Sequence, residues 1–323
     1  MSKIAFLFLT IDNINHPDLW KEYLFNDLSK ISIYVHPKYP QKVSVDWMKE
    51  NIISTLVHTS WGYLTDAFYH LLKEAYQDSK NEHFIFVSDS CIPLCKFSHF
   101  YKFIQRFSKR TSFIHFKDTI SDYDWHNKIT KVPRYQKYKL KKHEGLGNCL
   151  SRYHVQKLLD SKLDFNIFFN NLNCGDEYYL SLLDRDKYIY DQEMTYYNWE
   201  ENNHQIKSIN ILMDQIYQHA ENKEIERVNK RIASLKKKNY QLYKLKLKSL
   251  QQTLKKISNG NNKRLLSKSQ REEIQKLRIQ KSNLGKHPKT YIQVSKSLVR
   301  KLRSQGYFFL RKVDSRVKIN LDK

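Results

Sequence analysis

Two adjacent carboxylates, Asp176 and Glu177, follow the turn-forming residues Asn173-Cys174-Gly175. A positioned carboxylate can take the proton from an attacking hydroxyl group, so this pair could supply a general base. Acidic residues also stabilise the first turn of a helix, and a helix is expected to begin at this pair. From the spacing alone, this plainer role is the favoured one.

The composition fits one large domain or two small ones and provides enough apolar residues for a core. The chain has 323 residues, of which 40% are hydrophobic and 14% aromatic, and its formal net charge is +24. Such a charge attracts phosphates, nucleic acid, anionic membrane surfaces or nucleotide-sugars. Residues Gln205–Lys286 contain 21 Lys and Arg against 6 Asp and Glu, a net charge of +15, so most of the excess lies in one segment.

The four cysteines and the first residues bear on the compartment. Cys91, Cys95, Cys149 and Cys174 have neither CxxC spacing nor the density of a disulfide-stapled secreted domain, so reduced thiols are expected. The apolar run after Lys3 is too short for a signal sequence or a membrane span. Both observations predict a cytoplasmic protein.

The first third of the chain has the pattern of an α/β sheet. Two apolar, β-branched runs at Ile4–Thr10 and Ile31–His36 flank a helix-compatible stretch, which predicts a β-α-β unit. We expect a short polar strand near Ser54–Val57, an amphipathic helix over Tyr63–Ala75 and a strand at His83–Val87. Functional loops are then expected at the carboxyl ends of the strands.

The later elements are less regular. Asp118–His143 mixes basic and aromatic residues and predicts long loops over a cleft, and Ser151–Leu159 predicts a helix. After residue 287 we expect a strand, a helix over Ser295–Ser304 and an apolar strand at Tyr307–Leu310.

A helical hairpin is expected between these parts. Apolar residues at three- and four-residue spacing predict a long helix from Ile209 to about Ile257, and Ser269 with Glu272 forms a capping-box pattern that opens a second helix. The predicted organisation is therefore a first catalytic segment at 1–204, an inserted basic αα-hairpin or coiled coil at 205–286, and a C-terminal catalytic segment at 287–323.

Nine short segments, taken in order, carry a family resemblance. They are Ala5-Phe6-Leu7-Phe8-Leu9-Thr10, Tyr34-Val35-His36-Pro37, Trp61-Gly62 with Asp66-Ala67 and Leu71-Leu72, Phe86-Val87-Ser88-Asp89-Ser90-Cys91-Ile92-Pro93-Leu94, Leu150-Ser151-Arg152, Asp176-Glu177-Tyr178, Trp199, His287-Pro288-Lys289-Thr290 and Phe309-Leu310-Arg311-Lys312. No single segment is specific, but the ordered set resembles the core-2/I-branching glycosyltransferases, including their bacterial and plant relatives.

The resemblance implies a GT-A-like, Rossmann-type mixed sheet with flanking helices. It also implies an inverting transfer from a UDP-sugar, UDP-N-acetylglucosamine first and UDP-xylose second, to a hydroxyl of a glycan or glycoconjugate acceptor. The resemblance further implies that the reaction needs neither a metal ion nor a cofactor. Ser88-Asp89-Ser90 agrees with that expectation, because it has one carboxylate where an Asp-x-Asp metal motif would have two.

The resemblance also assigns roles to single residues. Glu177, with Asp176 beside it, becomes the general base, and Lys289 and Lys312 become the cations that hold the diphosphate. Lys289 stands where many relatives have Arg, so it keeps the charge and loses the bidentate fork, for which Arg311 could compensate.

Further contacts are predicted around these residues. His36, Asp89 and Trp61 are candidates on the donor side, although a histidine at a strand end is as often a structural hydrogen-bonding group. Trp199 could wall the acceptor pocket or lie in the core. Trp125, Arg134 and Tyr135 are the remaining acceptor candidates.

The basic hairpin motivates a competing hypothesis, a retired enzyme that serves as a scaffold. Its apolar seam is compatible with homo-oligomerisation, and its basic faces with RNA, DNA or an anionic membrane surface. No aromatic-rich base-reading motif accompanies the lysines. Oligomerisation or surface attachment is therefore favoured over specific nucleic-acid recognition.

Overall fold

The computed structural model describes residues 2–117, 141–161, 174–237, 249–253, 266–284 and 288–319. It divides into two compact units. The first comprises Met1–Tyr197 with Thr290–Lys323, and the second comprises Asn198–Lys289.

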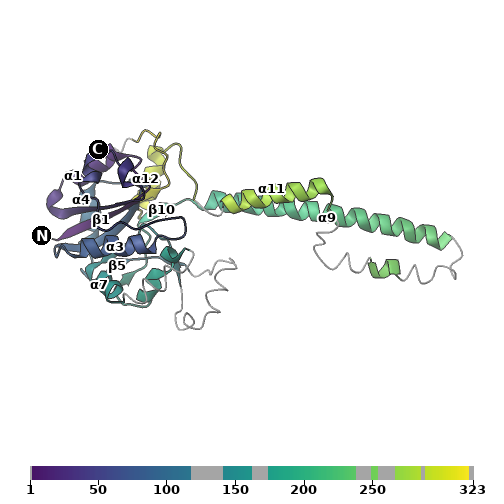
Figure 1. The fold of residues 1–323 in the computed structure, drawn as a ribbon, viewed down its shortest axis with the longest axis horizontal. Helices are drawn as coiled ribbons and strands as arrows, with labels where there is room; N and C mark the ends of the chain where they lie inside the picture. Colours follow the sequence, from purple (N-terminus) through teal and green to yellow (C-terminus); the bar gives the residue numbers. More distant parts are fainter. Residues whose placement is uncertain are drawn as a thin grey trace. The chain divides into compact units, whose positions relative to one another are not determined.

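The first unit is built on a six-stranded sheet of order β2-β1-β3-β8-β5-β9 (Figure 1). β1 (Lys3–Thr10) lies parallel to both β2 (Ile31–Pro37) and β3 (Asn81–Ser88). Every residue of β1 after Lys3 is buried, as expected of a central parallel strand covered on both faces. These three strands confirm the predicted β-α-β opening.

Shorter strands complete this sheet and make it mixed. β8 (Cys149–Ser151) pairs antiparallel with β3 and with β5 (Ser112–Phe113), and β9 (Ile189–Tyr190) lies parallel to β5. The predicted α/β class, a mixed sheet with flanking helices, is confirmed.

Helices cover both faces of the sheet because side chains alternate along its strands. Phe6 and Phe8 of β1 pack with α1 (Pro17–Phe25) and α4 (Phe97–Ile104) on one face. The other face of β1 packs with the helices predicted at Tyr63–Ala75 and Ser151–Leu159, which are α3 (Thr65–Tyr76) and α7 (Arg152–Asp160) (Figure 1). The short helices are η1 (Leu28–Lys30), η2 (Pro40–Lys42) and α2 (Asp46–Lys49).

A second sheet joins the C-terminal segment to the loop that follows β3. β11 (Phe309–Arg311) lies between β10 (Thr195–Tyr197), which is parallel to it, and β4 (Ile92–Pro93), which is antiparallel. α12 (Lys296–Ser304) precedes β11, and the Ser295 hydroxyl caps its N-terminus. A two-stranded ladder pairs β6 (Phe116–Lys117) with β7 (Lys142–His143).

Three expected elements differ from the structure. The segment Ser54–Val57 is not a strand, because the Val57 N–H donates to the imidazole of His36 instead of joining a ladder. The acid pair does not open an α-helix but lies in the 3-10 turn η4 (Gly175–Glu177), which η5 (Tyr179–Leu183) follows. The strand expected after residue 287 is a single bridge between Tyr291 and Val313.

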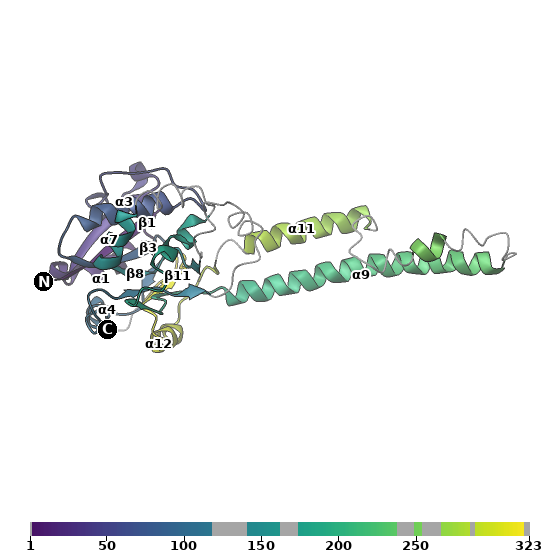
Figure 2. The same ribbon diagram turned by 90° about the horizontal axis from the view of Figure 1, so that it is seen from below.

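The second unit contains two helices in contact, α9 (Glu200–Lys237) and α11 (Lys268–Leu284) (Figure 2). Tyr217 and Ala220 of α9 pack against Ile274, and Arg278 donates to the Tyr217 hydroxyl at 3.1 Å. The capping box predicted at Ser269 and Glu272 is wrong by two residues. Ser267 and Gln270 form it, each side chain accepting from the backbone N–H of the other.

The described helices include none that is both long and apolar enough to span a membrane. All four cysteines are described, and no disulfide joins them.

Candidate active site

The acid pair sits on a tightly held turn. Cys174 adopts a left-handed backbone (φ 59°), and its N–H donates to the Gly62 carbonyl at 2.6 Å, which ties this turn to the loop before α3. In the 3-10 turn that follows, the two carboxylates differ in their exposure to solvent. Asp176 is buried, at 9% exposure, whereas the side chain of Glu177 remains 24% exposed.

Asp176 occupies an environment that disfavours its charge. Among the described residues its Oδ1 has no hydrogen-bond partner, and a Cβ on Gly145 would lie 2.6 Å from its Oδ2. Burial, and then the neighbouring Glu177 carboxylate, raises the pKa of Asp176 to about 7, against the opposing charges of Arg311 and Lys142. Asp176 is therefore partly protonated near neutral pH.

Glu177 is held by an ion pair. Lys142, on β7, places its Nζ 2.8 Å from Glu177 Oε2. Burial raises the pKa of Glu177, and the Lys142 ammonium opposes that rise. Burial by itself would lower the pKa of Lys142, but the charge and hydrogen bond of Glu177, with smaller effects of Tyr178 and Glu144, raise it. Lys142 thus helps to keep Glu177 ionised.

The positive charge of Arg311, the last residue of β11, acts on the acid pair. The Arg311 guanidinium lies over the Tyr197 ring, 5.6 Å from its centroid. Burial alone would lower the pKa of Arg311, but Tyr197, Cys91 and Asp89 raise it. Arg311 also lowers the pKa of Asp176, so the two side chains are close enough to interact electrostatically.

Lys312 follows directly and is partly buried. Burial, with repulsion from Arg311, lowers the pKa of Lys312, and Asp89 opposes this effect. Asp89 itself lies where β3 ends, and the Ile11 N–H approaches its Oδ2 at 3.5 Å. Asp89, Arg311 and Lys312 therefore influence one another near the carboxyl ends of β1 and β3, and Arg311 links this group electrostatically to Asp176.

Two other predicted donor-side residues lie in different settings. His36 is fully buried and accepts the Val57 N–H at 3.0 Å, and burial lowers its pKa to about 4. This geometry favours the structural role that the sequence left open. Trp61 is 52% exposed and lies in the Ser60–Tyr63 turn. The next residue, Gly62, accepts the N–H of Cys174, two residues before Asp176.

The remaining predicted residues belong to the second unit or lie outside the described residues. Lys289 and Trp199 belong to the second unit, where the Lys289 N–H donates to the Asn198 carbonyl. Trp125, Arg134 and Tyr135 lie outside the described residues. Their roles stay predictions.

Sequence reasoning missed Lys142 and Gly145. Nothing in the spacing separates Lys142 from the other Lys and Arg residues, because only the fold brings it to Glu177. The sequence did contain a sign of Gly145, because two of only 7 glycines, Gly145 and Gly147, lie two residues apart. Gly147 has a φ of 82°, and a Cβ there would lie 2.4 Å from Thr195 Oγ1.

The family model for the Core-2/I-Branching enzyme matches residues 4–229. The chain belongs to this family. The resemblance predicted from the ordered segments is confirmed, and the match includes the acid pair, Lys142 and Asp89. In the ranges that the structure describes, no three His, Cys, Asp or Glu side chains are grouped to hold a metal ion.

Two known proteins are similar to this chain. "Glycosyltransferase BC10" of Oryza sativa subsp. japonica is 31% identical over 142 residues, which cover 42% of this chain and 33% of that protein. The match thus spans about a third of that relative. A search of solved structures found the "Crystal structure of S. aureus TarS 1-349", whose sequence is 11% identical to this chain. The superposition covers 94% of this chain and 92% of that chain, at a TM-score of 0.32.

Proposed function

We propose that this member of the Core-2/I-Branching enzyme family is an inverting glycosyltransferase in which Glu177 is the general base. The observation that carries the proposal is the setting of Glu177, whose side chain is partly exposed and forms an ion pair with Lys142. Its neighbour Asp176 interacts electrostatically with Arg311. Asp176 is less accessible to an acceptor, because its side chain is buried against Gly145. Family membership and the similarity to a plant glycosyltransferase support the activity.

The proposed step is a single displacement. Glu177 accepts the proton of the acceptor hydroxyl, and the oxygen forms a bond to the anomeric carbon of the sugar. The bond between that carbon and the diphosphate breaks, and its electron pair leaves with the phosphate oxygen. Inversion follows because attack and departure occur on opposite faces.

Cationic side chains stabilise the departing diphosphate in this proposal. Arg311 and Lys312 are adjacent in the chain, and the charge of Asp89 acts to raise the pKa of both. Lys289 is the third candidate by resemblance. Positive charge aimed at a leaving group does the work that a metal does in other transferases. We therefore propose activity without a divalent metal, on UDP-N-acetylglucosamine first and UDP-xylose second, with a glycan or glycoconjugate acceptor.

The test is a donor screen followed by two substitutions. Release of UDP from each nucleotide-sugar is measured with a mixture of glycan acceptors, with and without EDTA. Glu177→Gln should lower kcat by about 10²–10⁴-fold with little change in the KM of the donor. Lys312→Gln should instead mainly raise that KM.

The matched control is Glu22→Gln, which removes an exposed carboxylate on α1 and should leave both constants unchanged. Full activity of Glu177→Gln would refute the role of the base. Loss of activity in EDTA that Mg²⁺ or Mn²⁺ restores would refute metal independence alone.

A further inference from the structure

The helix α12 lies at the surface of the first unit, as both Figure 1 and Figure 2 show. One side of this helix is apolar and faces the protein. Val299 and Leu302 are buried in a small core cluster that also contains Leu310 of β11 and Val313. The helix therefore rests on β11 and leaves its other side to the solvent.

The exposed side of α12 is cationic. Lys296, Arg300 and Lys301 are exposed, and the helical spacing puts them on the side away from Val299 and Leu302. The helix itself contains no acidic residue. Residues 290–319 contain eight Lys and Arg against one Asp, a net charge of +7. This surface therefore favours an anionic partner.

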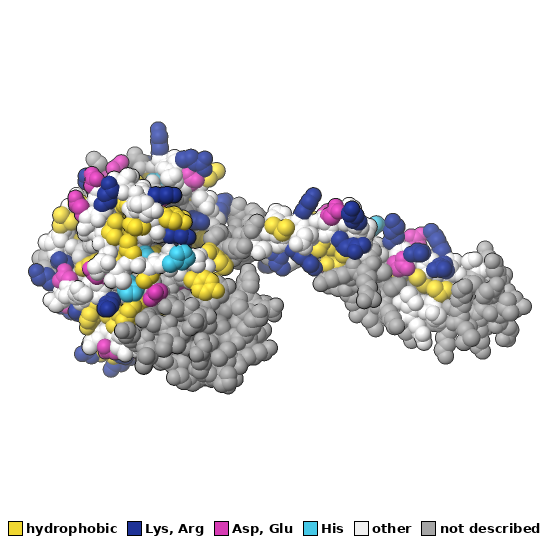
Figure 3. Space-filling view, viewed as in Figure 1, with side chains coloured by type: hydrophobic (Ala, Val, Ile, Leu, Met, Phe, Trp, Pro, Cys, Tyr) yellow, Lys and Arg dark blue, Asp and Glu magenta, His cyan; other side chains and the backbone are white. Residues whose placement is uncertain are grey.

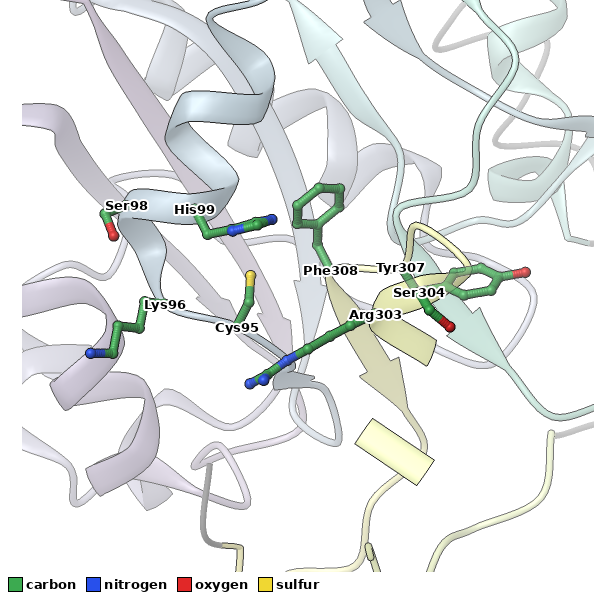
Figure 4. Close-up of a pocket in the computed structure, with 8 residues that line it drawn as sticks. All are labelled: Cys95, Lys96, Ser98, His99, Arg303, Ser304, Tyr307 and Phe308. Atoms are coloured by element: carbon green, nitrogen blue, oxygen red, sulfur yellow. The ribbon is translucent and has the colours of Figure 1, made fainter. Parts of the chain in front are cut away.

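Arg303, the fourth cation of α12, has a different role. Its Nε donates to the Leu94 carbonyl, and in Figure 4 its side chain runs toward the chain segment at Cys95. This hydrogen bond ties α12 to the loop before α4. The three exposed cations are therefore carried on a helix that the fold holds in place, so they form one fixed surface.

An apolar side chain lies next to these cations in the chain. Ile292 is 76% exposed, a larger fraction than any other large apolar side chain in the described ranges. Its neighbours Tyr291 and Val294 pack partly against the core cluster under α12, whereas Ile292 is left in the solvent, four residues before Lys296. Cations bind the headgroups of a lipid surface, and an apolar side chain beside them can enter the layer below.

We propose that Ile292 and the exposed cations of α12 form a docking surface for a bilayer that contains anionic phospholipids. Lys296, Arg300 and Lys301 bind the headgroups, and Ile292 enters the boundary between headgroups and acyl chains. A nucleic acid would also attract the cations, but it offers no apolar layer to Ile292, so the bilayer is the favoured partner. Because the claim concerns binding, it stands whether or not the transferase proposal holds.

The test is sedimentation of the full chain with vesicles of phosphatidylcholine alone or of phosphatidylcholine mixed with phosphatidylserine. The wild type should bind the mixed vesicles and not the neutral ones. The cation variant Lys296→Gln/Arg300→Gln/Lys301→Gln should bind the mixed vesicles at least about tenfold more weakly, since each cation near such a surface contributes about fivefold. Ile292→Ser, which keeps every charge, should weaken binding about fivefold because the apolar contact is lost.

The matched control Lys21→Gln/Lys73→Gln/Lys102→Gln removes as many exposed cations from α1, α3 and α4. Wild-type affinity of this control, with weaker binding of the cation variant and of Ile292→Ser, would support the docking surface. Equal weakening in the control and the cation variant would show diffuse attraction and overturn it. Undiminished binding of Ile292→Ser would also overturn it, as would binding of a single-stranded RNA, but not of vesicles, that the cation variant loses.

Discussion

The charges around Glu177 and the charges on the hairpin behave differently. Lys142 and Glu177 are 23% and 24% exposed and shift each other's pKa within a partly buried cluster. Lys230 and Glu226 of α9 form a pair of similar length, 2.7 Å, at 76% and 65% exposure. Figure 3 shows many Lys and Arg side chains on the surface of the hairpin.

The comparison teaches that burial, more than contact distance, decides what a charged residue does. Water screens the α9 pair, so either charge could be lost with little effect. In the acid turn each charge changes the ionisation of its neighbours, because little water replaces a missing partner. The experiments below test this difference, from the largest expected effect to the smallest.

Asp176→Asn should produce the largest change, in the pH dependence of stability. Asp176 has a folded-state pKa of about 7, above its unfolded value, so between about pH 4 and 7 the folded state binds more protons. The free energy of unfolding should therefore fall as pH rises through this window, by up to a few kcal/mol at about 1.4 kcal/mol per pKa unit. The variant should lack this fall and be the more stable protein at pH 8.

Denaturant unfolding at several pH values measures the effect, with Glu22→Gln as an exposed control that keeps the wild-type slope. Parallel curves for wild type and Asp176→Asn would show that Asp176 is ionised in the folded protein throughout this range.

Gly145→Ala should destabilise the first unit by about 1–3 kcal/mol, the usual cost of overpacking. The added methyl group would meet Asp176 Oδ2 at 2.6 Å. In an Asp176→Ala background the same change should cost almost nothing, because the clashing atom is gone. A double-mutant cycle by urea unfolding measures this coupling, and additive effects would place the strain elsewhere.

Lys142→Met should move the acidic limb of the kcat/KM profile to higher pH. Without the ammonium, burial acts unopposed and raises the pKa of Glu177 further, so less of the base is ionised. Activity at pH 6 should fall about tenfold relative to pH 9, and Lys142→Arg should restore the wild-type profile. A uniform loss at all pH values would instead indicate a role in binding or folding.

Glu226→Gln should have the smallest effect. Its partner Lys230 is exposed, so the melting temperature should stay within about 1 °C of wild type in low and high salt. A clear salt-dependent drop, measured by calorimetry, would show that the hairpin charges act as a network, like the charges around Glu177.

Local patterns predicted much of the fold. The apolar runs of β1, β2 and β3 and the periodicity of α3 and α7 appear in the sequence because each element buries its own face. The capping box of α11 was displaced by two residues because Ser267 and Ser269 offer the same hydroxyl, and local spacing does not distinguish them. The acid turn was misread as a helix start because its geometry depends on Gly62, far away in the chain.

The sequence by itself determined β1, β2 and β3, the helices α3 and α7, the helical character of the hairpin and the family, because these follow from local periodicity and from the order of short segments. Only the tertiary structure decided that Glu177 meets Lys142, that Gly145 makes room for Asp176 and that Arg311 interacts electrostatically with both Asp89 and Asp176. These contacts join residues from four separate parts of the chain, and burial then sets their charges. No local pattern records either effect.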